Sequence, residues 1–143
     1  MEHLTERDSQ ICTLRFSKGE DFYPTLRDAL NDLDFASGIV VTGIGMLSDF
    51  ELGYFDGEVY HNDFYSTPHE LTSMQGTIAI KESHGELLPH IHATLAGADH
   101  NVIGGHLHRA KVGVLCELVL LKFNKRLMMR KQLPDSDLWV LSL

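Results

Sequence analysis

The sequence lacks the features that mark a membrane-spanning or disulfide-stabilised chain. No apolar run approaches the roughly 20 residues that a membrane helix requires, and residues 1–8 lack the apolar segment of a signal peptide. The chain has only two cysteines, Cys12 and Cys116, which lie far apart and form no C-x-x-C motif. Both fall in strand-like runs, so we expect buried, reduced thiols in a chain that resides in the cytoplasm.

Positive charge is also scarce. Asp and Glu outnumber Lys and Arg by 20 to 12, which gives a formal net charge of −8. Nucleic-acid binding requires clustered positive charge, so this balance opposes direct DNA binding. Hydrophobic residues make up 43% and charged residues 22% of the 143 residues, which is ordinary globular usage. We therefore expect a single compact domain over residues 1–143, with a flexible N-terminus over residues 1–8.

One segment has the hydrophobic spacing of a helix, and the remainder is β-prone. Apolar residues between Asp21 and Leu33 recur at helical spacing, which predicts an amphipathic helix. Strands are expected over residues 10–17, 39–42, 46–55, 58–65, 77–82, 111–123, 126–132 and 138–143. Gly43-Ile44-Gly45 interrupts this pattern and indicates a β-bulge or a close backbone approach. The sum is an α+β fold, a mostly antiparallel β-sheet with one main α-helix packed on a face.

Three histidines have the spacing of a metal site. His90 and His92 are two residues apart in a β-prone segment, so their side chains point to the same face of a strand. His106 follows a turn-rich loop, directly behind Gly104-Gly105, which permits a close backbone approach. Three converging imidazoles suit a divalent transition metal such as zinc and leave a fourth tetrahedral position open. The alternative is that all three are structural histidines whose hydrogen bonds are satisfied within a sheet.

Three further residues could support this site. His108 shares the strand parity of His106, so it is either an additional ligand or an exposed polar residue. Glu70 and Glu117 lie in or beside apolar runs. Each is either a charge at a strand edge, an acceptor for a ligand imidazole, or a base beside a metal-bound water. The sequence has no dinucleotide fingerprint and no nucleophile elbow, so it identifies no cofactor-binding glycines and no catalytic residue.

Several motifs occur in the order typical of one known family. They are Gly38 to Gly45, Glu70 to Ile78, Pro89 to Ala93, Gly104 to Leu107, and Glu117-Leu118. In this order they make the chain resemble the plants-and-prokaryotes conserved (PPC) domain, with a core of about residues 10–133. The resemblance covers nearly the whole chain, and the ordered motifs make it specific.

The resemblance implies an α+β fold, a homotrimer, and a divalent metal held by His90, His92 and His106. Plant members of the family follow an AT-hook, a short basic segment that binds the minor groove of DNA. Bacterial and archaeal members are usually the domain alone, and they are often labelled as candidate DNA-binding proteins with a PD1-like domain. This chain has no AT-hook and no Arg-Gly-Arg-Pro run.

The histidine spacing predicts a metal site, and the resemblance implies a metal-binding homotrimer with a regulatory or DNA-associated role and with a protein partner or a small ligand at the metal. The alternative is a metal-dependent enzyme, a hydrolase or a cupin-like catalyst, that uses the open coordination position. A cupin motif requires a glutamate where Leu95 and Ala96 stand in this chain. The basic run over residues 126–131 is better explained by a solvated strand or a trimer rim than by nucleic-acid binding.

Overall fold

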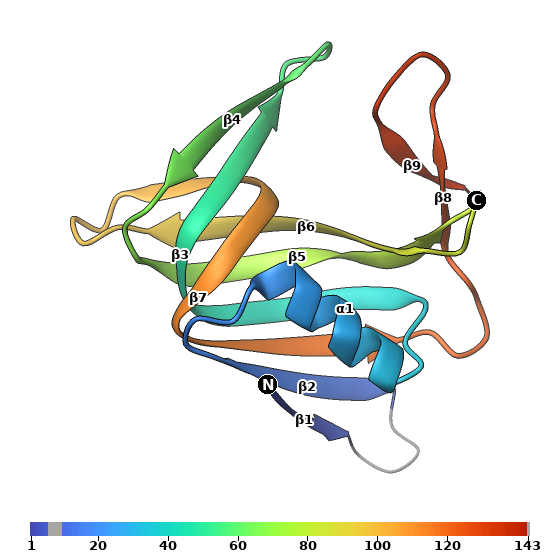
Figure 1. Ribbon diagram of the computed structural model, residues 1–143, viewed down its shortest axis with the longest axis horizontal. Coiled ribbons are helices and arrows are strands. Elements are labelled where there is room, and N and C mark those ends of the chain that lie inside the picture. Colours follow the sequence, from blue (N-terminus) through green and yellow to red (C-terminus); the bar gives the residue numbers. More distant parts are fainter. Residues whose placement is uncertain (6–9, 143) are drawn as a thin grey trace.

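The described residues, 1–5 and 10–142, of this computed structural model contain nine β-strands and one α-helix (Figure 1). Within these residues one helix accompanies a chain that is otherwise mostly β-strand. This composition confirms the predicted α+β fold class. In chain order the elements are β1 (Glu2–Thr5), β2 (Ile11–Ser17), α1 (Phe22–Asp32), β3 (Gly38–Phe55), β4 (Tyr60–Tyr65), β5 (His69–Lys81), β6 (Leu87–Ala96), β7 (Val102–Lys122), β8 (Met129–Gln132) and β9 (Trp139–Ser142).

Four strands close on one another to form the centre of the sheet. β3 pairs with β5, β5 pairs with β6, β6 pairs with β7, and β7 pairs again with β3, all antiparallel. The first residues of β7 pair with β6, whereas the rest of the strand runs along β3. At the point of exchange, His106 is opposite His92 on one side and Gly53 on the other. This closure pairs residues 92–96 of β6 on both sides, with β5 and with β7.

Bulges allow β3 and β7 to bend as they pass from one part of the sheet to another. β3 has 18 residues and β7 has 21, and their pairing shifts register between Val40 and Thr42 and between Gly45 and Leu47. These shifts flank Gly43-Ile44-Gly45, where the sequence predicts an irregularity, because bulges bend a strand and increase its twist. The predicted strands 39–42 and 46–55 are therefore one bent strand, and the predicted strand 111–123 is the second half of β7.

Helix α1 packs its apolar side into the core. Its helical spacing places Phe22, Leu26, Ala29 and Leu30 on the buried side, as predicted. Phe22 stacks on Phe16 of β2, with the ring centroids 5.4 Å apart. Because burial of a Phe or Leu side chain contributes about 1.5–3 kcal/mol, this face holds the helix over the sheet (Figure 1). Among residues 1–5 and 10–142, no helix combines the length and apolar character needed to cross a membrane.

Part of the segment that we expect to be flexible forms a strand. Residues 2–5 are β1 and pair antiparallel with β2. The physical reason is that β2 would otherwise present an unpaired strand edge. Residues 6–8, the remainder of that prediction, lie outside the described residues. Cys12 and Cys116 are both buried, in agreement with the sequence.

We predict that Gly45 does not tolerate a side chain. Its φ of +140° is unfavourable for other residues, and an added Cβ would overlap the carbonyl oxygen of Leu115 on β7. Gly45→Ala should therefore lower the free energy of unfolding by about 2 kcal/mol or more, as measured by urea denaturation. The matched control is Gly57→Ala, because Gly57 has a φ of +108° but open space around it. Equal losses in the two variants would contradict a steric constraint from β7.

Candidate metal centre

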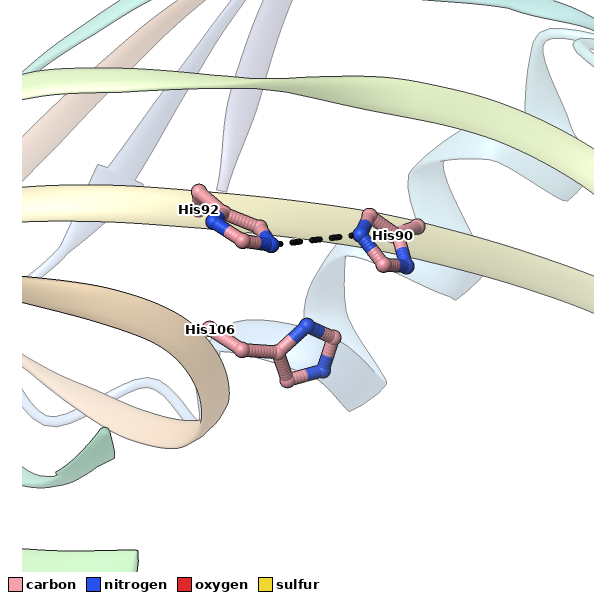
Figure 2. Close-up of side chains that lie close together, drawn as sticks. All are labelled: His90, His92 and His106. Carbon is pink, nitrogen blue, oxygen red and sulfur yellow. Dashed lines mark hydrogen bonds between the residues drawn. The ribbon is translucent and has the colours of Figure 1, made fainter. Parts of the chain in front are cut away.

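The structure brings the three predicted histidines together. His90 and His92 project from the same face of β6, as their spacing predicts. His106 lies directly opposite His92 in the β6–β7 pair, and its ring faces the other two (Figure 2). The Nε2 atoms of His90 and His92 are 3.2 Å apart. One nitrogen from each of the three rings lies within 4.8 Å of the others.

This donor set fits a divalent transition metal. Two imidazole nitrogens bound to one tetrahedral zinc at about 2.0–2.1 Å would lie about 3.3 Å apart, close to the spacing found between His90 and His92. Nδ1 of His106 is buried and has no hydrogen-bond partner among the described residues. A buried nitrogen without a partner is costly, and a bound cation would satisfy it. Three imidazoles leave one tetrahedral position open.

Burial keeps two of these imidazoles neutral. Desolvation, followed by the positive charge of Arg130 and by His92, lowers the pKa of His90 to about 4. Desolvation, followed by the neighbouring histidines and Arg130, lowers the pKa of His106 to about 3. Both rings are therefore unprotonated at neutral pH, and the neutral imidazole is the form that binds a metal.

Glycines and one tyrosine hold β7 in place around His106. A Cβ added to Gly105 would lie 2.7 Å from the carbonyl oxygen of Gly53, so the close backbone approach predicted for this glycine is present. Tyr23 of α1 donates a hydrogen bond from its hydroxyl to the carbonyl oxygen of Leu107, at 2.5 Å. Leu107 follows His106 directly, so the helix is linked to the strand that carries the third histidine.

Of the three residues predicted to support the site, His108 lies beside the histidine cluster, whereas Glu70 and Glu117 do not. The ring of His108 is 4.5 Å from that of His106 between centroids, and burial lowers its pKa. Glu70 pairs with Ala96 at the far end of β6, and Glu117 lies opposite Ile44 in the second half of β7. Both carboxylates are exposed, and neither has a hydrogen bond or ion pair to a clustered histidine within the described part of the chain.

A cleft opens beside the histidines. It has a volume of about 1030 Å³, and its lining comes largely from the turn that joins β3 to β4 and from the hairpin formed by β8 and β9. Its lining includes three histidines, one arginine and three other aromatic side chains: His90, His106, His108, Arg130, Phe55, Tyr60 and Trp139.

The sequence indicates a surface role for the run that contains Arg130, whereas the structure buries this side chain. The sequence offers little signal for this burial, since a charged residue in a short strand is usually exposed.

Comparison with known proteins gives a consistent result. Residues 4–124 match the family model described as the Plants and Prokaryotes Conserved (PCC) domain. No match was found among the curated proteins.

Several solved structures resemble this chain. A metal-containing protein from Archaeoglobus fulgidus is 26% identical, with a TM-score of 0.82 and coverage of 93% of both chains. A plant- and prokaryote-conserved protein from Pyrococcus horikoshii is 25% identical, with a TM-score of 0.76 and coverage of 87% of this chain and 85% of that one. A candidate DNA-binding protein from Ralstonia eutropha is 25% identical, with a TM-score of 0.79 and coverage of 92% and 90%.

Proposed function

The chain belongs to the plants and prokaryotes conserved domain family, and we propose that it forms a metal-binding homotrimer with a regulatory or DNA-associated role in the cytoplasm. The observation that carries this proposal is the convergence of one nitrogen each from His90, His92 and His106. A relative of similar fold is described as metal-containing, which supports the same assignment. The open position beside the cleft suits a small ligand or a group from a protein partner.

Zinc is the metal we propose for this site. His90, His92 and His106 would hold it, and neutral imidazole nitrogens are ligands that zinc takes readily. When bound, zinc supplies Lewis acidity, which can lower the pKa of a coordinated water to about 7. Burial keeps the rings of His90 and His106 unprotonated, and the pairing of β6 with β7 fixes the positions of the histidines.

Removal of any one of the three imidazoles should abolish stable metal binding. We expect the wild-type protein to retain about one zinc per chain after dialysis. His90→Ala, His92→Ala and His106→Ala should each retain less than about a tenth of that, as measured by elemental analysis of purified protein. His84→Ala is the matched control, because His84 is exposed on the turn before β6. Stoichiometric zinc in all three cluster variants would refute the site.

An exposed apolar surface supports self-association. Four apolar side chains on the paired strands β3 and β7 are 39–55% exposed: Val41, Ile44, Val114 and Leu115. Exposed apolar residues gathered on neighbouring strands are typical of a protein–protein interface. A trimer that covers these side chains would remove their apolar area from water.

A charge placed on this surface should weaken the trimer. We expect light scattering during gel filtration to give three chain masses for the wild type and a smaller species for Ile44→Glu, because burying a carboxylate at an interface is costly. Leu127→Glu serves as the control, since Leu127 is 51% exposed but lies outside these strands. A wild-type protein that remains monomeric at micromolar concentration would contradict the trimer.

We propose that any association with DNA is mediated by a partner protein. The formal net charge of −8 opposes direct contact with phosphates, although a relative of similar fold is described as a candidate DNA-binding protein. Regulation through a bound partner requires no basic surface on this chain.

The isolated protein should not bind duplex DNA tightly. We expect no saturable fluorescence-anisotropy change with a labelled duplex at low salt and micromolar protein, for both zinc-loaded and chelator-treated samples. Tight binding that weakens steeply with added salt would instead establish direct contact with the phosphate backbone, since counterion release produces that dependence.

A metal-dependent enzyme is the second candidate function. The observation that favours it is the cleft beside an open coordination position. A screen of ester, amide and phosphoester substrates with zinc-loaded protein distinguishes the two functions, because hydrolysis that is lost on chelation and restored by zinc would favour the enzyme.

A further inference from the structure

Arg130 is a buried cation without an anionic partner in the described part of the chain. Only 6% of the residue is exposed. One terminal guanidinium nitrogen donates to the carbonyl oxygen of Trp139 at 2.8 Å, and the other donates to Oγ1 of Thr77 at 2.7 Å. Nε is buried and has no partner, and no described carboxylate forms an ion pair with this side chain.

The position of Arg130 places its charge beside the histidine cluster. Thr77 lies directly opposite His90 in the β5–β6 pair, so the hydrogen bond to Thr77 brings the guanidinium next to His90. Arg130 and His90 both line the cleft. A buried charge without a counter-ion is expensive, and its cost is recovered when an anion binds beside it. A guanidinium is well suited to that role, because its planar donors match a carboxylate.

The charges along the cleft favour an anion with a single charge. Arg130 is the only Lys or Arg among the residues that line it, whereas Glu58, Asp135 and Asp137 are exposed at its edge. These carboxylates would repel a nucleotide or another polyanion from the entrance. A molecule with one carboxylate meets less repulsion and still neutralises the guanidinium.

The walls of the cleft suit an apolar body behind that carboxylate. Tyr60 lies against the histidines, with its ring centroid 5.5 Å from that of His106 and 5.1 Å from that of His108. Trp139 belongs to the hairpin that also carries Arg130. The remaining apolar lining comes from both sides of the cleft: Phe55, Val59, Leu88, Pro89, Leu133, Pro134 and Leu138.

We propose that this cleft binds a small organic acid, whose carboxylate is held by Arg130 beside the open position of the three-histidine metal and whose apolar body packs between Tyr60 and Trp139. This inference rests on the proposed metal centre. It assigns to Arg130 the recognition of the ligand's charge and to the C-terminal hairpin one wall of the binding site.

Trp139 provides a direct readout of binding, because it is the only tryptophan in the chain and lines the cleft. Phenylacetate is titrated into zinc-loaded, full-length protein while tryptophan fluorescence is recorded. Phenylacetamide, which has the same shape without the charge, is titrated in parallel. We expect a saturable change with phenylacetate and at least tenfold weaker binding of phenylacetamide, since the amide cannot pair with a guanidinium charge.

Variants then test whether Arg130 recognises the carboxylate. Arg130→Gln should bind phenylacetate at least tenfold more weakly, provided that circular dichroism shows it to be folded. Thr77→Val keeps the guanidinium but removes one of its fixing hydrogen bonds, so binding should weaken about fivefold even if Arg130→Gln fails to fold. Arg109→Gln is the matched control and should bind like the wild type, because Arg109 is 63% exposed and does not line the cleft.

Three results would overturn the inference: no saturable change in the wild type, equal binding of the amide, or wild-type affinity in both Arg130→Gln and Thr77→Val. Phenylacetate binding that survives complete removal of zinc would overturn the placement of the carboxylate beside the metal. Zinc content is measured on the same samples. Stoichiometric zinc without phenylacetate binding refutes the organic-acid ligand alone, whereas a wild type that takes up no zinc refutes the metal centre itself.

Discussion

The candidate site depends on the pairing of β7 with two partners at once. At His106 the strand is hydrogen-bonded to β6 on one side and to β3 on the other, so its register is fixed twice. A slip of one residue against β6 would turn His106 to the opposite face of the sheet, away from His92. The same slip would break the pairing of Gly53 with His106. The pairing of β7 with both β6 and β3 therefore determines the position of the His106 imidazole.

Local patterns predict the elements of this fold better than their connections. The helix follows from apolar spacing between Asp21 and Leu33, and the structure places it at Phe22–Asp32. The two longest strands, β3 and β7, are not predicted as single strands, because a bulge interrupts the alternation that identifies a strand. Closure of the sheet depends on pairing between segments distant in the chain, which no local pattern encodes.

The residues of the site also differ in whether a local pattern predicts them or whether they depend on pairing between distant segments. His90 and His92 are predictable as neighbours, because residues two apart on a strand share a face. His106 joins them through the register of β7, so the sequence supports its inclusion without fixing its position. Glu70 and Glu117 have suitable chemistry, but the register carries both away from the cluster. Arg130 is the opposite case, because it lies near the cluster although the sequence does not indicate it. Its charge predicts exposure, whereas the fold buries its side chain.

The C-terminal hairpin, formed by β8 and β9, supplies one wall of the cleft from outside the segment that matches the family model. Residues 4–124 carry the family match and all three clustered histidines, whereas Arg130 and Trp139 lie beyond the matched segment. The hairpin joins the rest of the sheet through β8, which pairs with only two residues of β5, Ile80 and Lys81. Substitutions in this hairpin can therefore change the lining of the cleft without replacing any of the three clustered histidines.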